Sequence, residues 1–275
     1  MQLLALYTNS EAGKSQMISG KNTALKISSP SLEISASIVP WDTIALGFPV
    51  ASIEFIKIND SLVADKEFDT LFDWVDDREV RLISCRIKHS DIWTSIFLES
   101  KGFNFIEMVL HPFVSCLQSL KIESQDFDVT EVLENEIGII EEMASRAFGY
   151  ERFHIDPRIN SNLANERYRR WIQNAVESDE QCLVKISNSQ KNLGFFIYEL
   201  RPDGTAYWHL TAVNPDLLGA GIGTAVWYAM MEHSKSLGAG KILTTISARN
   251  VPALNLYSKL NFRFAPPEIT LHRFK

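Results

Sequence analysis

Cysteine is scarce in this 275-residue chain, which holds only Cys85, Cys116 and Cys182. Their number is odd and they lie far apart, so they do not form the disulfide framework of a small secreted domain. Their spacing is not that of a metal site either, and we expect no bound metal. Isolated thiols are typical of a cytosolic protein, so we expect three buried, reduced cysteines.

The chain also lacks any run of 18 or more apolar residues, the length that a membrane-spanning helix requires. Residues 1–14 have neither the basic start nor the apolar core of a signal peptide. Excess basic charge is missing as well, because the net charge is −7, which disfavours general binding to nucleic acid. We therefore expect a cytoplasmic protein with no membrane or nucleic-acid partner.

Length and hydrophobic content predict two domains. A chain of 275 residues is long for one domain, and 45% hydrophobic residues with 16 Phe can form two cores. Composition changes over residues 111–126, which predicts domains over 1–122 and 123–275. Local patterns in the first domain predict strands at 3–7 and 32–38, a packed loop over 40–50 and a helix over 65–76.

The most informative stretch runs from Tyr207 to Gly223, YWHLTAVNPDLLGAGIG. Its alternating first half predicts a strand that ends just before Pro215, since proline cannot donate to a sheet. A glycine-rich loop over 219–223 and a helical pattern over 224–237 follow. Strand, glycine loop and helix together direct several backbone N–H groups and the positive end of a helix dipole at one spot. This geometry predicts a site for a phosphate or pyrophosphate.

Two familiar glycine motifs do not fit this stretch. A dinucleotide-binding loop belongs to the first βαβ unit and is followed by an acidic residue. Here the loop comes after about 200 residues, and the strand predicted over 241–248 carries no acid at its end. A P-loop requires a lysine before its Ser or Thr, whereas Gly223 is followed directly by Thr224.

Two motifs instead resemble the GNAT acetyltransferase superfamily, namely VNPDLLGAGIG from Val213 to Gly223 and NVPALNLYSKLNF from Asn250 to Phe262. The resemblance implies an α/β fold of the α+β type, with a central mixed, V-splayed sheet flanked by helices, and acetyl-CoA as cosubstrate. In that family the first motif cradles the pyrophosphate, and the second supplies an asparagine and a tyrosine near the thioester. The family usually has Arg or Gln at the position of Leu218, a departure that weakens a backbone-held site without abolishing it. The cofactor-binding residues implied here are Thr211, Ala212, Val213, Leu218, Gly219, Ala220, Gly221, Ile222, Gly223, Thr224, Asn250, Ala253 and Tyr257.

The second motif also aligns with an earlier part of the chain. Placing Phe103 on Phe262 at a constant offset puts Asp91 on Asn250, Thr94 on Ala253 and Leu98 on Tyr257. An internal repeat of a strand–helix–strand unit explains this match, although chance similarity of two amphipathic segments is the alternative. The first copy lacks the glycine loop and the tyrosine, so we expect a smaller, partial GNAT-like domain that does not bind CoA.

A narrower resemblance covers SRAFGYERFHIDPR at 145–158, ANERYRRWIQNAV at 164–176 and the segment near Trp41. These segments look like GNAT enzymes that acetylate the amine of a dTDP-linked amino sugar, the dTDP-fucosamine acetyltransferases. The resemblance implies a nucleotide-sugar acceptor, with Arg152 or Arg158 able to pair with a phosphate. The arginines at 167, 169 and 170 are predicted to form a solvated helix face. The candidate substrate-binding residues are Arg152, His154, Asp156, Tyr168 and Trp171.

The predicted catalytic residues are Tyr257 and His209. A phenol stays protonated at neutral pH, so Tyr257 can give a proton to the leaving thiolate. His209, predicted on the same strand face as Val213, is the candidate base, with Glu199 as the alternative. Packing and structural hydrogen bonding are the plainer roles for these side chains.

Several functions remain open at this point. The leading one is an acetyl-CoA-dependent N-acetyltransferase acting on a small amine, most specifically a dTDP-linked amino-deoxy sugar for surface polysaccharide synthesis, in a monomer or homodimer. The acceptor could instead be a polyamine, an aminoglycoside or a protein N-terminus. A non-catalytic CoA-binding module is the third alternative, favoured by Leu218 and opposed by Asn250 and Tyr257.

Overall fold

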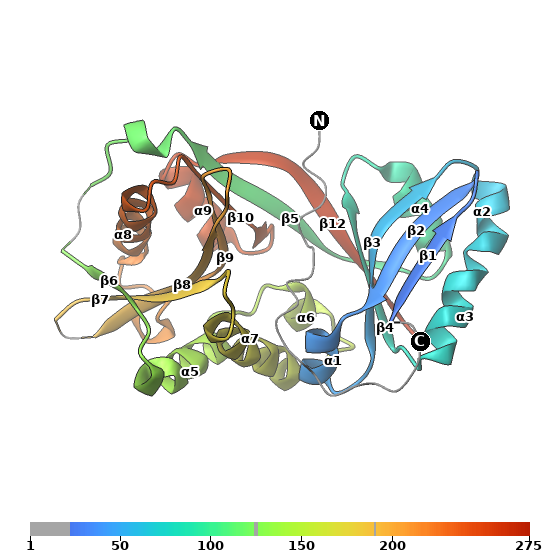
Figure 1. The fold of residues 1–275 in the computed structure, drawn as a ribbon, viewed down its shortest axis with the longest axis horizontal. Helices are drawn as coiled ribbons and strands as arrows, with labels where there is room; N and C mark the ends of the chain where they lie inside the picture. Colours follow the sequence, from blue (N-terminus) through green and yellow to red (C-terminus); the bar gives the residue numbers. More distant parts are fainter. Residues whose placement is uncertain (1–22, 124–125, 190) are drawn as a thin grey trace. The chain divides into compact units, whose positions relative to one another are not determined.

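The computed structural model describes residues 23–123, 126–189 and 191–275. These residues form two compact units, one ending at Glu107 and completed by Glu268–Lys275, the other spanning Met108–Pro267 (Figure 1). The long strands β5 (Asn104–Ser115) and β12 (Arg263–Phe274) each contribute to both units. The strand predicted at 3–7 lies outside the described residues. No helix in the described chain is both long and apolar enough to cross a bilayer.

The first unit is a mixed sheet with helices. Its strands follow the order β1-β2-β3-β4-β12, with β3 and β4 parallel and the other neighbours antiparallel. Residues 268–274 of β12 pair with β4, so the pairing begins just beyond Pro266 and Pro267, which lack the N–H that a ladder needs. The elements are β1 (Ala24–Ser28), β2 (Leu32–Ile38), α1 (Pro40–Leu46), β3 (Val50–Ile58), α2 (Ser61–Glu67), α3 (Asp69–Asp77), β4 (Leu82–Lys88) and α4 (Ile92–Ser100).

Two local predictions for this unit were wrong. The loop expected over 40–50 contains helix α1, because Pro40 fixes the first helical φ and Gly47 ends the helix with φ 74°. The single helix expected over 65–76 is two helices, since the chain turns at Phe68. The Phe68 side chain is fully buried and packs edge-on against Phe97 with ring centroids 5.3 Å apart, so core packing places the break.

The second unit has the mixed, helix-flanked sheet that the sequence predicts. Its strand order is β5-β10-β9-β8-β7-β6, with β9 and β10 parallel and the remaining neighbours antiparallel. Buried side chains of α5 and α7 pack on one face, and those of α8 and α9 pack on the other. The elements are η1 (Leu117–Ser119), β6 (Asp128–Glu131), η2 (Glu134–Glu136), α5 (Ile137–Ala147), α6 (Arg152–Ile155), α7 (Ser161–Val176), β7 (Cys182–Ser187), β8 (Asn192–Leu200), β9 (Thr205–Val213), η3 (Pro215–Leu217), α8 (Gly223–Ser236), β10 (Lys241–Thr244), β11 (Ile246–Ser247) and α9 (Val251–Lys259).

The segment of changed composition contains regular structure, and two of the three thiols differ from prediction. Residues 111–115 of the predicted boundary segment belong to β5, and η1 follows them. All three cysteines are free, but only Cys85 is buried as expected, since Cys116 is exposed and Cys182 is half-buried. Cys116 follows the last residue of β5 and lies in the left-handed region with φ 58°.

Helices α4 and α9 share local geometry residue for residue. Asp91 (φ −87°, ψ 71°) and Asn250 (φ −82°, ψ 70°) cap them, each side chain accepting the N–H three residues ahead, at 3.2 Å and 3.1 Å. At the other end, the N–H of Phe103 donates to the carbonyl of Leu98, and that of Phe262 donates to the carbonyl of Tyr257, both at 3.0 Å. These matches follow the alignment of the two sequence segments and support an internal repeat.

Candidate active site

Strands β9 and β10 separate halfway along β9. Their parallel pairing runs from Thr205–Lys241 to Trp208–Thr244 and stops there, where the Thr244 hydroxyl donates to the carbonyl of Trp208 at 2.8 Å. The chain then enters β11, which pairs with β5 instead of β9. The single strand expected over 241–248 is therefore two strands. On the side of β10, residues 209–213 have no paired strand among those described, so their backbone groups can bind an extended ligand.

A β-bulge sits at the same point, on the other side of β9. Ile197 pairs with Leu210 and Tyr198 pairs with Trp208, which leaves His209 as the extra residue. A bulge reverses the alternation of side chains, and such irregularities often lie next to active sites. Trp208 and Val213 accordingly pack on the same core, beside α8 and α9. The prediction that His209 shares a face with Val213 was therefore wrong.

His209 lies beside the alternative base. Its Nε2 is 3.1 Å from a carboxylate oxygen of Glu199, and its ring meets Tyr207 edge-on with centroids 4.6 Å apart. Burial lowers the pKa of His209, while the hydrogen bond and charge of Glu199 raise it and the charge of Arg201 lowers it. Arg201 in turn contacts Glu199 at 3.3 Å and lies over the Tyr207 ring. The two candidate bases thus form one hydrogen-bonded pair.

The glycine loop follows η3 and leads into α8. Gly219 and Gly221 have φ of 82° and 76°, which L side chains rarely adopt, and no atom lies within 4 Å of where a Cβ would stand. The N-cap residue, Ile222, provides no side-chain hydrogen bond to the first turn of α8. Helical N–H groups at this end have no intrahelical partner, so the first turn of α8 is open to an anion. Leu218 is 72% exposed and contributes no polar group.

A lysine that no sequence motif indicated lies at the N-terminus of α8. Lys259, the last residue of α9, donates from Nζ to the hydroxyl of Thr224 at 3.2 Å. Thr224 belongs to the first turn of α8. Lys259 thus brings a positive charge to the first turn of α8. Its position two residues after Tyr257 was the one sequence signal for it.

Tyr257 is fully buried on α9, and its hydroxyl makes no hydrogen bond within the described residues. Burial raises its pKa, and the hydrogen-bonding groups of Trp227, Thr211 and Thr244 oppose this effect. Thr211 and Thr244 come from the two strands that separate. A buried phenol without a partner at this point fits a ligand group that would take its hydrogen bond. Asn250, in contrast, uses its side-chain oxygen to cap α9 through the N–H of Ala253.

Comparison with known proteins agrees with this geometry. Residues 141–262 match the Acetyltransferase (GNAT) family. The chain carries a GNAT-family acetyltransferase domain. The fold of the Sphaerobacter thermophilus GCN5-related N-acetyltransferase is similar, with a TM-score of 0.63 at 12% identity over 88% of this chain and 76% of that one.

Two curated relatives extend the comparison. The spore coat polysaccharide biosynthesis protein SpsD of Bacillus subtilis is 20% identical over 229 residues, which cover 81% of this chain and 76% of SpsD. Mycothiol acetyltransferase of Saccharopolyspora erythraea is 29% identical over 80 residues, 29% of this chain. The matched part spans about a quarter of the length of that acetyltransferase, 26%.

The predicted acceptor residues of the GNAT domain lie on α6, α7 and the loop after α6. His154 Nε2 is 2.8 Å from the side-chain oxygen of Asn165, and its ring stacks on Tyr168 at 5.5 Å. Burial lowers the pKa of His154. Tyr168 also stacks on Phe148 at 4.4 Å, so it is a core residue as well as a wall of this cluster. Trp171 continues the row, with its ring 6.3 Å from that of Tyr168.

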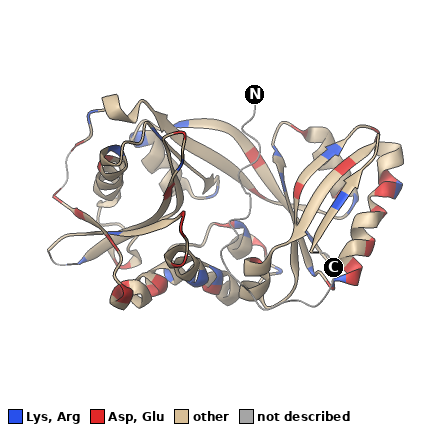
Figure 2. Ribbon diagram, viewed as in Figure 1, with Lys and Arg blue, Asp and Glu red and all other residues tan. Residues whose placement is uncertain are grey.

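Charged residues of this region are more constrained than predicted. Asp156 is 1% exposed and binds the Arg158 guanidinium through both carboxylate oxygens at 2.8 Å, so this pair is built into the loop. Arg152 lies over the ring of Phe153. Arg167 was expected on a solvated face but is 5% exposed, with its guanidinium over three aromatic rings. The other two arginines of α7 form exposed ion pairs with Glu142 and Glu166, and both signs of charge alternate along α5 and α7 (Figure 2).

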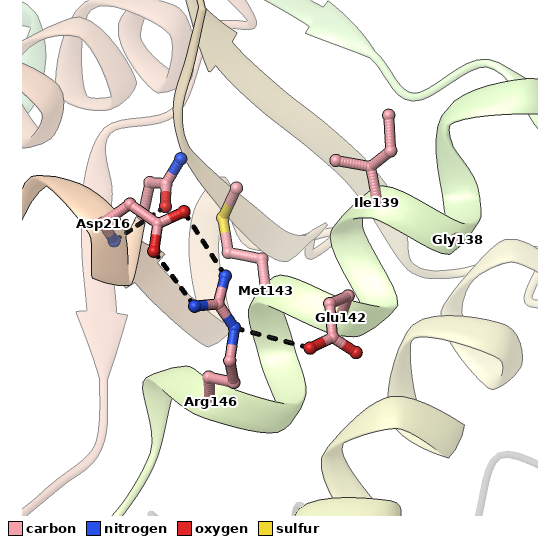
Figure 3. Close-up of a pocket in the computed structure, with 7 residues that line it drawn as sticks. Gly138, Ile139, Glu142, Met143, Arg146 and Asp216 are labelled. Carbon is pink, nitrogen blue, oxygen red and sulfur yellow. Dashed lines mark hydrogen bonds and ion pairs between the residues drawn. The ribbon is translucent and has the colours of Figure 1, made fainter.

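A pocket of about 330 Å³ opens between α5 and the segment after β9. Figure 3 shows Arg146 of α5 reaching Asp216 of η3, with contacts of 3.0 Å and 3.4 Å, and Glu142 on its other side. Each partner shifts the other, so the pKa of Arg146 is raised and that of Asp216 is lowered. No sequence pattern indicates this pair, because its members are distant in the chain. The Arg146–Asp216 pair links α5 to η3, which precedes the glycine loop. The lining residues are Gly138, Ile139, Glu142, Met143, Arg146, Asn214 and Asp216.

Proposed function

We propose that this chain transfers the acetyl group of acetyl-CoA to the primary amine of a nucleotide-linked amino-deoxy sugar, with dTDP as the nucleotide. The observation that carries the acetyl-transfer part is the alignment of three features in one unit. These are the opening between β9 and β10, the uncapped N-terminus of α8 after the glycine loop, and the buried unpaired hydroxyl of Tyr257. They match the extended, anionic and thioester portions of one ligand.

The sugar acceptor is supported by two independent similarities. The resemblance of residues 145–158 and 164–176 to amino-sugar acetyltransferases concerns α6, α7 and their loop. The similarity to SpsD, named for polysaccharide biosynthesis, extends over 81% of the chain. Phe148 and Trp171, which flank the buried ring of Tyr168, are half-buried and offer aromatic surface of the kind that sugar and base rings stack on. Synthesis of a surface polysaccharide in the cytoplasm is the setting that this proposal implies.

A different small acceptor is the second candidate. The similarity to mycothiol acetyltransferase falls in an 80-residue segment and favours acetyl transfer without favouring a nucleotide. A polyamine or aminoglycoside acceptor would suit an acidic chain of net charge −7. A non-catalytic CoA-binding role is disfavoured, because such a role gives no reason for keeping the buried hydroxyl of Tyr257 unpaired.

In the proposed reaction the chain supplies binding and proton transfer. Acetyl-CoA, when bound, provides an electrophilic carbonyl and a thiolate leaving group. The backbone of the loop over 219–223 holds the pyrophosphate together with Lys259, and residues 209–213 of β9 bind the extended arm. The amine nitrogen forms a bond to the carbonyl carbon as the carbon–sulfur bond breaks.

Two protons move in this step. His209, neutral because burial lowers its pKa, takes the proton of the amine through a water, with Glu199 holding the imidazole. Tyr257 gives its phenolic proton to the sulfur. Proton exchange with solvent then returns His209 to neutral and Tyr257 to its phenol form. No metal is required for this chemistry.

We further propose that function divides near the boundary predicted from sequence, with the acetyltransferase domain in 123–275 and a partial, degenerate GNAT-like domain in 1–122. The matched caps of α4 and α9 support a shared origin. Leu98 is fully buried where the second copy has Tyr257, so the first copy lacks the acid. Only one acetyl-CoA should therefore bind per chain.

Thermal unfolding tests the proposal. Acetyl-CoA alone, then dTDP-, UDP- and free amino sugars, then polyamines, would be added to the full chain. A cognate ligand at 100 times its dissociation constant adds about 2.7 kcal/mol to the free energy of unfolding. Stabilisation by acetyl-CoA without stabilisation by any nucleotide sugar would contradict the acceptor part alone.

A further inference from the structure

Trp227 of α8 faces Tyr257 of α9 inside the core of the second unit. The two rings meet nearly edge-on, with centroids 6.1 Å apart and planes at 78°. Trp227 is 5% exposed and is held from the other side by Phe196, whose ring centroid is 4.9 Å away. Packing therefore holds the two rings against each other in the core.

Both polar atoms of this pair are buried without a hydrogen-bond partner within the described residues. One is the indole Nε1–H of Trp227, which can only donate, and the other is the Tyr257 hydroxyl, which can donate and accept. Buried polar groups normally have partners, so two unpartnered groups side by side need an explanation. Trp208, in the same core, behaves normally, since its Nε1–H donates to Ser234 at 3.1 Å.

We propose that Trp227 is a positioning residue for the acid, its indole N–H donating to the Tyr257 oxygen and so turning the phenolic O–H toward the opening between β9 and β10. This inference rests on the acetyl transfer proposed above and adds a residue to it. A phenol oxygen that accepts from the indole must place its own hydrogen elsewhere.

The same contact stabilises what remains after proton transfer. When the Tyr257 O–H bond breaks and the sulfur–hydrogen bond forms, the electron pair of the O–H bond stays on the phenolate oxygen. The indole N–H then donates to a charged acceptor, and such hydrogen bonds are roughly twice as strong as neutral ones. The groups that act on this hydroxyl are Trp227 from α8, Thr211 from β9 and Thr244 from β10, together with burial, and each of the three side chains lowers the pKa that burial raises.

The test replaces Trp227 by Phe, which keeps an aromatic ring and removes the N–H. Turnover at neutral pH should fall about tenfold, the factor expected from losing one hydrogen bond in the transition state, with the KM for acetyl-CoA unchanged. The alkaline limb of the rate profile should move to higher pH, because the phenol loses a group that stabilises its charged form. Trp208→Phe is the matched control: it removes a core indole N–H that bonds to Ser234, and should leave the alkaline limb in place.

A second measurement does not depend on activity. The chain has six Trp, so its indole N–H signals can be resolved by ¹⁵N NMR, and the one lost in Trp227→Phe identifies Trp227. Tyr257→Phe should shift that signal more than any other indole signal. An unmoved Trp227 signal would overturn the proposal even if the protein acetylates an amine. If the Trp227 signal shifts but the protein acetylates no amine, the proposed function would be overturned, while the contact between the Trp227 indole and the Tyr257 hydroxyl would stand.

Discussion

The imidazole of His209 and the carboxylate of Glu199 are joined by a 3.1 Å hydrogen bond at the bulge of β9. Burial lowers the pKa of His209, and the neighbouring carboxylate raises it. A histidine base works in its neutral form, so activity is lost as pH falls through its pKa. The loss of activity at low pH in the pH–rate profile should therefore follow the pKa of His209 in this pair.

Glu199→Gln separates the two candidate bases. If His209 is the base, removing the carboxylate charge lowers its pKa further, so the acid limb of kcat/KM should move to lower pH with turnover kept within about tenfold. Loss of turnover at every pH would instead make Glu199 the base. His209→Asn should reduce turnover by about 10²-fold or more, and near-native activity of that variant would contradict the role of His209 as the base.

Gly221→Asp should abolish acetyl-CoA binding. Gly221 has φ 76° with open space around it, so a new side chain meets no protein atom but points a carboxylate at the anion site. Gly204→Asp is the matched control, since Gly204 has φ 77°, equally open space and a place in the turn between β8 and β9. Calorimetry should find binding lost in the first variant and kept in the second. Equal affinities would place the anion site elsewhere.

Lys259→Met should weaken acetyl-CoA binding without abolishing it. Lys259 adds one charge beside Thr224 at the start of α8, so its loss should cost about fivefold to tenfold in affinity, an amount that shrinks at high salt. Lys275→Met is the control. It removes one exposed lysine whose ion pair with Asp76 lies within the first unit, whereas the proposed acetyl-CoA site belongs to the second. The same loss in both variants, or none in either, would exclude Lys259 from the site.

Tyr257→Phe should leave acetyl-CoA affinity nearly unchanged and reduce turnover by about 10²–10⁴-fold, the usual contribution of a positioned acid. The ring keeps its packing against Phe262, whose centroid is 5.0 Å away, so the variant should fold. Activity of this variant should fall less at high pH, because the group whose loss of a proton lowers the rate there is gone. A variant with near-native turnover and the same loss of activity at high pH would leave Tyr257 as a packing residue.

The sequence predicted most of what depends on local pattern. The strand before Pro215, the glycine loop and the helix after it lie where the pattern of YWHLTAVNPDLLGAGIG places them. β2 has the predicted bounds, 32–38, and the family match covers both motifs. These features follow from alternation, proline and glycine, which act within a few residues.

What the sequence could not predict arises from contacts between distant segments. The bulge at His209 exists because β8 shifts its register against β9, and single-strand periodicity contains no sign of it. Arg167 is buried because aromatic rings from α6 and its own helix surround it, although three arginines within four residues suggested a solvated face. The contacts of Lys259 with Thr224 and of Trp227 with Tyr257 likewise arise from the packing of α8 against α9.

The central claim is acetyl transfer to a nucleotide-linked amino sugar, and product analysis by mass spectrometry tests it most directly. The full chain would be incubated with acetyl-CoA and dTDP-4-amino-4,6-dideoxygalactose, with the UDP-linked and nucleotide-free amino sugars and spermidine in parallel. A reaction without protein is the control for uncatalysed transfer. The account predicts an N-acetylated dTDP-sugar formed mole for mole with free CoA, at a kcat/KM at least tenfold above that of each competitor. CoA released equally with spermidine or the free sugar, or no acetylated dTDP-sugar at all, would contradict it.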